Sequence, residues 1–312
     1  MKNFTCLDDV PDPASLVKQA LALKKQPLQY DTIGKGKRLV LLFFNPSLRT
    51  RLSTQAAAQN LGMHVICMNT NSGWSLEFED QVVMNGQSAE HIREAAAVVS
   101  QYADIIGIRT FPSLNDREKD YSDFILQQFT RFAQVPVVSL ESAIRHPLQS
   151  LADLMTIQEL QTKSKPKVVV SWAPHPKALP QAVTNSFLEW ISTSDAEVVL
   201  THPKGYELSP MFSQKLQPVY NQNEALEGAD FVYVKNWSAF HEYGKVLQQD
   251  LQWTITLDKL KHTQQAKVLH CLPVRRNVVI EEKVLDSPHS AVIQQADNRT
   301  YAAQAVLKNI LE

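Results

Sequence analysis

The sequence predicts an α/β protein with two doubly wound parallel-sheet domains joined by helices. The chain has 312 residues, about twice the length of a typical domain. Short apolar runs alternate with longer amphipathic stretches, and four of these runs precede residue 146 while four follow it. With 44% apolar and 20% charged residues, the composition is that of an ordinary globular protein. We therefore expect two similar halves, each with a parallel sheet covered by helices.

The predicted strands are the short apolar runs. In order along the chain they cover residues 38–44, 64–68, 104–108, 135–139, 167–172, 197–201, 231–234 and 267–270. The amphipathic stretches predict helices over residues 13–24, 50–61, 88–101, 121–132, 146–160, 180–193 and 298–311. A polar break at residues 162–167 follows the helix at 146–160, so we expect that helix to bridge the two domains.

Charge and cysteine content limit the class of protein. The net charge of −1 argues against a nucleic-acid-binding surface, which is usually basic. Three cysteines, Cys6, Cys67 and Cys271, fit a reducing compartment better than a disulfide framework. The chain has no signal-peptide-like apolar run at its start and no membrane-spanning run of roughly 18 apolar residues. We expect a cytoplasmic protein with no nucleic-acid or membrane partner.

A turn after the first predicted strand has the features of an anion site. Ser47 ends the turn, and Arg49, Thr50 and Arg51 open a helix whose unpaired N–H groups and positive dipole end favour an anion. The arginines can add fork-shaped hydrogen bonds, and the two hydroxyls can donate to phosphate or carbonyl oxygens. The alternative for this run taken alone is a helix that Ser47 caps, with solvated arginines.

Polar residues also follow the third and fourth predicted strands. Arg109 follows the strand at 104–108, and Glu141 and the run His146-Pro147-Leu148-Gln149 follow the strand at 135–139. Ligands of open parallel sheets gather at the carboxyl ends of strands, where these residues fall. His146 can donate to a developing oxyanion and Gln149 can bind an amide. A His-Pro pair taken alone is more often a simple turn.

The last predicted strand ends in a third polar cluster. Cys271 follows it directly, and Pro273, Arg275 and Arg276 come next. A free cysteine is commonly a small core residue, and this alternative applies to Cys271 taken alone. The neighbouring arginines favour a second reading, in which a thiol and two cations lie at the carboxyl end of a strand.

Together these residues resemble the transcarbamylase superfamily of aspartate and ornithine carbamoyltransferases. Ser47-Leu48-Arg49-Thr50-Arg51 is similar to the carbamoyl-phosphate loop, the run at 146–149 to the carbonyl-binding motif, and His270-Cys271-Leu272-Pro273 to the ornithine-branch signature. Their order and spacing match over nearly the whole chain. The resemblance implies a carbamoyl-phosphate-binding domain at residues 1–145, completed by a C-terminal helix at about 296–312, and an acylornithine-binding domain at 146–295.

The acceptor segment differs from that of ornithine carbamoyltransferases. Those enzymes hold the α-ammonium group of ornithine with an acidic residue and a Ser-Met-Gly element, where this chain has Lys235. A lysine there would repel an ammonium group, so the acceptor is expected to be acylated on its α-amine. Trp74, the loop at 172–177 and the run at 297–299 resemble the N-acylornithine branch of the family. That branch implies a homotrimer, in which the Trp74 and Ala89 loops complete a neighbouring site, and a trefoil knot in the second domain.

Two positions separate succinyl from acetyl acceptors by resemblance. N-acetylornithine enzymes have a glutamate where this chain has Ala89 and a carboxylated lysine where it has Val279. Both departures remove an anion that would repel a succinyl carboxylate. N-succinylornithine enzymes have a proline at the position of Ala89, so the match rests on the missing glutamate. We expect N-succinyl-L-ornithine as acceptor, with N-acetyl-L-ornithine as the alternative.

The expected reaction transfers the carbamoyl group of carbamoyl phosphate to the δ-amine of N-succinyl-L-ornithine, giving N-succinyl-L-citrulline and phosphate in arginine biosynthesis, without a metal or other cofactor. The resemblance implies Thr50, Arg109, His146 and Cys271 as catalytic residues. The implied carbamoyl-phosphate ligands are Ser47, Leu48, Arg49, Thr50, Trp74, Arg109, His146, Pro147, Leu148, Gln149, Cys271, Leu272 and Arg299. The implied acylornithine ligands are Ala89, Glu141, His175, Lys235 and Arg275. A hypothesis of another class is a catalytically silent paralogue that binds carbamoyl phosphate or an acylamino acid.

Overall fold

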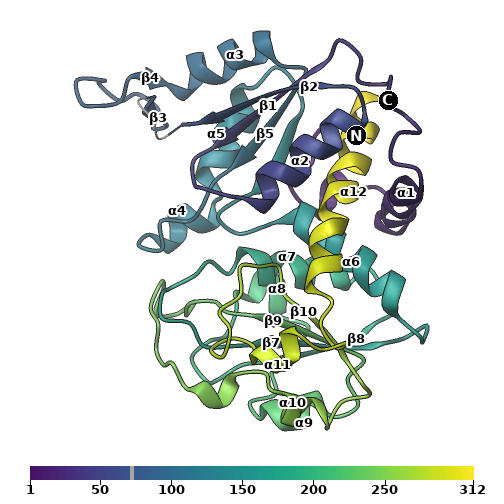
Figure 1. Cartoon of the computed structure of the whole chain (residues 1–312). Coiled ribbons are helices and arrows are strands. Elements are labelled where there is room, and N and C mark those ends of the chain that lie inside the picture. The colour runs from purple at the N-terminus through teal and green to yellow at the C-terminus, as the bar shows by residue number, and fades with distance from the viewer. Residues whose placement is uncertain (71–73) are drawn as a thin grey trace. The chain divides into compact units, whose positions relative to one another are not determined.

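The computed structural model describes residues 1–70 and 74–312 and has the predicted α/β class (Figure 1). Contacts along the chain divide it into two compact units. Unit 1 comprises Met1–Ser113, Arg117–Leu148 and Arg299–Glu312, and unit 2 comprises Leu114–Asp116 and Gln149–Asn298. Helices α6 (Pro147–Leu160) and α12 (Val292–Leu311) each contain residues of both units. The chain therefore leaves unit 1 through α6 and returns to it through α12.

Unit 1 is built on a parallel sheet, which within the described residues has four strands in the order β2-β1-β5-β6. The strands are β1 (Arg38–Phe43), β2 (His64–Asn69), β5 (Ile105–Arg109) and β6 (Val137–Glu141). The other elements are η1 (Leu7–Asp9), α1 (Pro13–Lys25), α2 (Arg49–Asn60), the short pair β3 (Leu76–Glu77) and β4 (Glu90–His91), α3 (Ile92–Tyr102), α4 (Arg117–Tyr121) and α5 (Phe124–Phe132). Each predicted strand of this half is therefore present, with its ends shifted by up to two residues.

Strands β1, β5 and β6 are buried along nearly their whole length, which explains why they are mainly apolar runs, whereas the edge strand β2 is partly exposed. On one face, Val40 and Ile106 pack with Ala96 of α3 and Phe129 of α5. The C-terminal part of α12 joins this unit through side chains. Asn60 Nδ2 of α2 donates to Gln304 Oε1 at 3.1 Å. Asn309 Nδ2 donates to Gln19 Oε1 of α1 at 2.8 Å.

Unit 2 has its own parallel sheet, in the order β10-β9-β7-β8 within the described residues. Its strands are β7 (Lys167–Trp172), β8 (Glu197–Thr201), β9 (Phe231–Lys235) and β10 (Lys267–Leu269). Its further helices are α7 (Ala182–Ile191), α8 (Pro210–Ser213), α9 (Gln222–Leu226), η2 (Leu251–Trp253), α10 (Leu257–Leu260) and α11 (Glu282–Leu285). The Phe187 ring of α7 stacks on Tyr233 of β9, with 4.1 Å between the ring centroids. Val232 and Val268, by contrast, pack in the core that contains Leu226 and Val284.

The two sheets share one topology. In each unit the second strand along the chain pairs on one side of the first, and the third strand pairs on the other side. The side on which the next strand is added therefore reverses between β1 and β5 in unit 1 and between β7 and β9 in unit 2. In open α/β sheets, ligands bind beyond the carboxyl ends of strands at such a switch point. This topology points to the residues after β1 and β5, and to those after β7 and β9.

Three predicted helices differ from those observed. The helix predicted at 88–101 begins only at Ile92, because Glu90 and His91 pair with β3 and His91 Nδ1 accepts a hydrogen bond from Arg93 N at 3.2 Å. The helix predicted at 121–132 is broken between α4 and α5, where Asp123 has a left-handed backbone with φ of 54°. The helix predicted at 298–311 begins six residues earlier, at Val292.

Candidate active site

The turn after β1 leaves the first amides of α2 without a side-chain cap. Leu48, not Ser47, occupies the N-cap position, and it makes no side-chain capping hydrogen bond. The alternative in which Ser47 caps the helix is therefore wrong. Thr50 and Arg299 are both buried, and Arg299 Nη2 donates to Thr50 Oγ1 at 2.6 Å. Uncapped N–H groups next to a buried guanidinium are suited to binding an anion.

Arg109 links the ends of three strands of unit 1. It is the last residue of β5, and its Nη1 donates to the carbonyl oxygens of Asn45 at 3.0 Å and Pro46 at 2.8 Å. Its Nη2 donates to Glu141 Oε2, at the end of β6, at 2.8 Å. Arg109 therefore fixes the turn that precedes Ser47, and its own position is fixed by a buried carboxylate.

Glu141 also lies close to the predicted catalytic histidine. Its Oε2 is 3.7 Å from His146 Nε2, and the side chains of Arg109, Glu141 and His146 are each no more than 8% exposed. The resemblance places Glu141 among the acylornithine ligands, whereas its contacts within unit 1 are with two predicted carbamoyl-phosphate ligands. The structure thus gathers Arg109, Glu141 and His146 at the carboxyl ends of β5 and β6.

Trp74 and Ala89 belong to the segment that contains β3 and β4. Trp74 is half-buried, packs against the unit 1 core, and donates from Nε1 to Glu90 Oε2 at 2.7 Å. Ala89 is exposed, and its backbone N donates to Ser75 O at 2.8 Å. Within the described residues of this single chain, the indole N–H therefore bonds to Glu90 rather than to the turn at Ser47.

The end of β10 is held by a chain of buried hydrogen bonds in unit 2. His270 N donates to Gln295 Oε1 at 2.8 Å, and Leu272 N donates to His270 Nδ1 at 2.9 Å. Leu272 has a left-handed φ of 57° and precedes a cis peptide bond to Pro273. Cys271 is half-buried, so it is not the fully buried core residue of the alternative reading. Two hydrogen bonds within unit 2 therefore hold the turn that carries Cys271.

Gln149 is linked to the turn after β10 through Asp153 and Gln295, two residues that the sequence did not indicate. Gln149 Nε2 and Gln295 Nε2 both donate to Asp153 Oδ1, each at 2.7 Å. Asp153 lies one helical turn after Gln149 on α6, and this spacing is the one sequence signal that could have identified it. Gln295 had no such signal, because it lies in the part of α12 that was not predicted to be helical.

A group of cations lies beyond the ends of β7, β9 and β10. Arg275 Nε donates to His175 Nε2 at 3.0 Å, so a neutral His175 carries its proton on Nδ1, which lies 2.9 Å from Lys177 O and 3.1 Å from Lys177 N. Burial, followed by the charges of Arg275 and Lys235, lowers the pKa of His175 below its ordinary value. Lys235 is only 7% exposed, yet it pairs with no carboxylate in the described part of unit 2. We call the two cations Lys235 and Arg275, together with the neutral His175, the cation group; it suits a carboxylate ligand.

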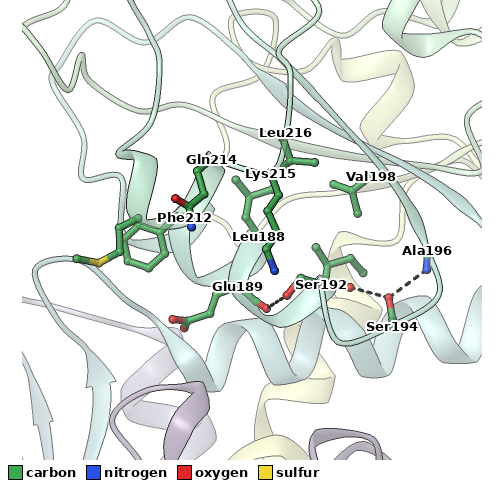
Figure 2. Close-up of a pocket in the computed structure, with 12 residues that line it drawn as sticks. Leu188, Glu189, Ser192, Ser194, Ala196, Val198, Phe212, Gln214, Lys215 and Leu216 are labelled. Atoms are coloured by element: carbon green, nitrogen blue, oxygen red, sulfur yellow. Dashed lines mark hydrogen bonds between the residues drawn. The ribbon is translucent and has the colours of Figure 1, made fainter.

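Unit 2 also contains a separate cavity of about 370 Å³, between α7 and α8 (Figure 2). It is lined by Leu188, Glu189, Ile191, Ser192, Ser194, Ala196, Val198, Met211, Phe212, Gln214, Lys215 and Leu216. None of these is a predicted site residue.

In residues 1–70 and 74–312, no cluster of His, Cys, Asp and Glu side chains could hold a metal ion. In the same described ranges, no helix is both long and apolar enough to cross a bilayer.

Comparison with protein families matches both halves of the chain. Residues 2–159 match the carbamoyl-phosphate-binding domain of aspartate/ornithine carbamoyltransferases, and residues 180–310 match their Asp/Orn-binding domain. The chain is 48% identical to an N-succinylornithine carbamoyltransferase from Bacteroides thetaiotaomicron, over 100% of this chain and 99% of the relative. It is 35% identical to an N-acetylornithine carbamoyltransferase from Xanthomonas axonopodis pv. citri, over 94% and 91%.

Solved structures give the same result at the level of fold. A crystal structure of N-acetyl-L-ornithine transcarbamylase superimposes with a TM-score of 0.93 at 33% identity, covering 99% of this chain and all of that one. A variant of the same enzyme, complexed with carbamyl phosphate and N-succinyl-L-norvaline, has a TM-score of 0.94. The predicted fold of two parallel-sheet domains is confirmed by these matches. The chain belongs to the aspartate/ornithine carbamoyltransferase family.

Proposed function

We propose that this protein transfers the carbamoyl group of carbamoyl phosphate to the δ-amine of N-succinyl-L-ornithine, giving N-succinyl-L-citrulline and phosphate. The observation that carries the choice of an acylated acceptor over free ornithine is the cation group in unit 2, whose buried Lys235 has no carboxylate partner within the described residues. A buried cation is costly unless an anion compensates it. A doubly carboxylated acceptor supplies such an anion. The 48% identity to an N-succinylornithine carbamoyltransferase over the whole chain supports the same assignment.

In this proposal, unit 1 binds the phosphate group of the donor. The uncapped amides of α2, with Ser47, Arg49 and the buried Arg299, hold the phosphate group. Trp74 adds to this phosphate site from a neighbouring subunit. Gln149 and the backbone at Cys271 and Leu272 hold the carbamoyl NH₂ group in unit 2. Each of these roles is assigned from the family resemblance, at a position where this sequence matches a family motif.

The transfer itself needs no cofactor. The neutral δ-amine attacks the carbamoyl carbon, and an oxyanion forms on the carbonyl oxygen. The C–O bond to phosphate then breaks, and the proton that the amine loses passes to the leaving phosphate. Thr50, Arg109 and His146 stabilise the oxyanion, and Glu141 keeps Arg109 and His146 in place. Cys271 lies beside the attacking amine and forms no covalent intermediate. A δ-amine has a pKa of about 10, so activity rises toward alkaline pH as more of the amine is neutral.

Acceptor selection depends on charge in unit 2. The cation group binds the carboxylates of the acylated substrate, whereas the α-ammonium of free ornithine would meet like charges. His175 contributes in its neutral form, because its Nε2 accepts the hydrogen bond from Arg275. Acylation removes the ammonium charge, which makes an acylornithine a better acceptor than ornithine.

The preference for succinyl over acetyl rests on two missing charged residues. Val279 is 1% exposed and packs in the unit 2 core, where N-acetylornithine enzymes have a lysine. Ala89 stands where those enzymes have a glutamate. Solved structures of N-acetyl-L-ornithine transcarbamylase include glutamate-to-alanine, valine, proline and serine variants complexed with N-succinyl-L-norvaline. We take that glutamate to be the one at the Ala89 position, so its loss fits a succinyl ligand.

We further propose that three chains assemble so that the Trp74 and Ala89 loops complete a neighbouring site, and that the loop at 172–177 belongs to a trefoil knot. Both follow the resemblance to the N-acylornithine branch. In the single chain, Trp74 bonds to Glu90, so assembly would have to bring the side chain to a neighbour's phosphate site.

The direct test of the reaction is product identification. Purified protein is incubated with carbamoyl phosphate and N-succinyl-, N-acetyl- or free L-ornithine, and the ureido product and released phosphate are quantified by mass spectrometry and colorimetry. The proposal predicts N-succinyl-L-citrulline and phosphate in equal amounts. Binding of carbamoyl phosphate without turnover of any acceptor would instead establish the silent paralogue.

A further inference from the structure

Asp153 is a buried carboxylate between two buried glutamines, and the proposed reaction gives it no role. Gln149, Asp153 and Gln295 are each no more than 1% exposed. One oxygen of Asp153 accepts a hydrogen bond from Gln149 and another from Gln295, each at 2.7 Å. All three residues belong to unit 2, where α6 carries the first two and α12 the third.

The carboxylate fixes which way each amide points. An ionised carboxylate is acceptor-only, so it must face the NH₂ end of a glutamine, and the carbonyl end then points away from it. Gln149 therefore presents Oε1 away from Asp153. A carbonyl oxygen in this position is an acceptor, which is what the NH₂ group of a carbamoyl donor requires.

The same carboxylate orients the turn after β10 through Gln295. With its NH₂ held by Asp153, Gln295 has its Oε1 available to accept from His270 N at 2.8 Å. His270 Nδ1 in turn accepts from Leu272 N at 2.9 Å. Two N–H groups of the turn, those of His270 and Leu272, thus donate to acceptors inside the protein. What the backbone of these two residues offers a ligand is a carbonyl oxygen, again an acceptor.

We propose that Asp153 is a positioning residue that makes unit 2 select a carbamoyl donor over its acetyl analogue. Acetyl phosphate has a methyl group in place of the NH₂ of carbamoyl phosphate and is otherwise nearly isosteric. Acceptors oriented by Asp153 bond to the NH₂ group but not to the methyl group. This inference rests on the proposed function, because it takes Gln149 and the turn at Cys271 to hold the carbamoyl NH₂.

The test compares the dissociation constants of the two phosphates for the full-length protein by titration calorimetry. Asp153→Asn keeps the size of the side chain but offers an NH₂ group to the glutamines, which frees their amides to turn. Gln295→Met keeps the volume but removes the link to His270. In both variants we expect the affinity for carbamoyl phosphate to fall about 10- to 100-fold, as for the loss of a hydrogen bond to a buried charged network. We expect the affinity for acetyl phosphate to stay unchanged within error.

Gln294→Met is the matched control. Gln294 also joins α12 to α6, since its Nε2 donates to Glu159 Oε2 at 2.9 Å, but this bond is exposed and has no contact with the turn. The control should retain the wild-type preference for carbamoyl phosphate. Equal weakening of both phosphates, no weakening of either, or a wild-type protein that does not distinguish them would each overturn the proposal. Should Asp153→Asn not fold, Gln295→Met alone decides.

Failure of this inference and failure of the proposed function can be told apart. A wild-type protein that carbamoylates N-succinyl-L-ornithine while the Gln295→Met variant keeps its preference contradicts only the role of Asp153. A wild-type protein that binds carbamoyl phosphate selectively but turns over no acceptor contradicts the proposed reaction, and the binding ratios still test Asp153.

Discussion

Charge is the property that distinguishes the site residues of this chain. In unit 1, Glu141 neutralises Arg109 and lies 3.7 Å from His146, so the phosphate-binding unit contains its own counterion. In unit 2, Lys235 has no such counterion among the described residues. The sequence predicted that Arg109 and His146 lie at the carboxyl ends of strands, and each of them lies close to Glu141. Their pairing with Glu141 could not be predicted, because it depends on strand order.

Two residues that contact predicted site residues could not be identified from the sequence. Asp153 and Gln295 are far apart in the chain and meet only because α6 and α12 pack together. A glutamine in a helix gives no sign of whether it is buried. Most of the motif residues follow a strand, which is why the sequence indicates them, whereas Asp153 and Gln295 lie on helices.

Substituting Ala89 with glutamate tests acyl selection at a single residue. Ala89→Glu should lower kcat/KM for N-succinyl-L-ornithine about 10- to 100-fold, since a carboxylate pair in a partly desolvated site costs about 1–3 kcal/mol. The value for N-acetyl-L-ornithine should change little. Steady-state kinetics with both acceptors provide the measurement.

The matched control for this variant is Gln87→Glu, which adds the same charge to the same exposed segment two residues away. It should leave the ratio of the two kcat/KM values unchanged. If Ala89→Glu left the ratio unchanged as well, Ala89 would not face the acyl group, and the basis for preferring succinyl would be lost.

At the level of elements, the strands were the most predictable part of the fold. The central strands are mainly apolar because they are buried on both faces, and β7 and β8 have the predicted bounds. Helix ends were less predictable. Asp123 breaks a helix through a left-handed backbone, and Glu90 and His91 pair as a strand where helical spacing continues. Such ends are set by tertiary contacts, which local patterns do not contain.

The loop after β8 provides a pH-dependent test of unit 2. His202 is buried, its ring bonds to Pro203 O at 2.9 Å, and burial lowers the pKa of the imidazole below its ordinary value. Below the ordinary value of about 6.5, the unfolded chain takes up a proton that the folded chain resists, so the free energy of unfolding falls as pH falls. In His202→Gln, the number of protons taken up on unfolding, which sets the slope of the unfolding free energy with pH, should fall by up to about one.

Urea unfolding between about pH 5 and pH 7.5 provides the measurement for His202, since histidine titrates in this range. His241→Gln is the control, because His241 is exposed. An unchanged pH slope in His202→Gln, or an equal change in the control, would show that another group causes the acid sensitivity.

For the whole molecule, the repeated strand order accounts for the distribution of site residues. Both sheets have their switch point between the first and third strands along the chain, and most of the predicted ligands lie at or after the carboxyl ends of the first, third and fourth strands of a unit. The sequence predicted two similar halves from the count of apolar runs alone. It gave no strand order, because pairing between strands depends on contacts that are distant in sequence.

The proposed trimer makes a prediction about mixed subunits. Trp74→Ala and Arg109→Gln should each be nearly inactive alone, because the first lacks a residue for the neighbour's site and the second lacks one for its own. Unfolding and refolding the two variants together should restore activity, since random assembly gives about a quarter of the sites both native residues. Activity of the refolded mixture is compared with that of each variant refolded alone. No recovery in a mixture that forms trimers by light scattering would exclude shared sites.

The identity of the acceptor is the central claim, and one measurement tests it most directly. The kcat/KM values of the wild-type protein for N-succinyl-, N-acetyl- and free L-ornithine are compared at saturating carbamoyl phosphate. The account predicts that N-succinyl-L-ornithine is preferred over N-acetyl-L-ornithine by about tenfold or more, and that free ornithine is not measurably carbamoylated. An equal or higher value for N-acetyl-L-ornithine, or efficient use of free ornithine, would contradict it.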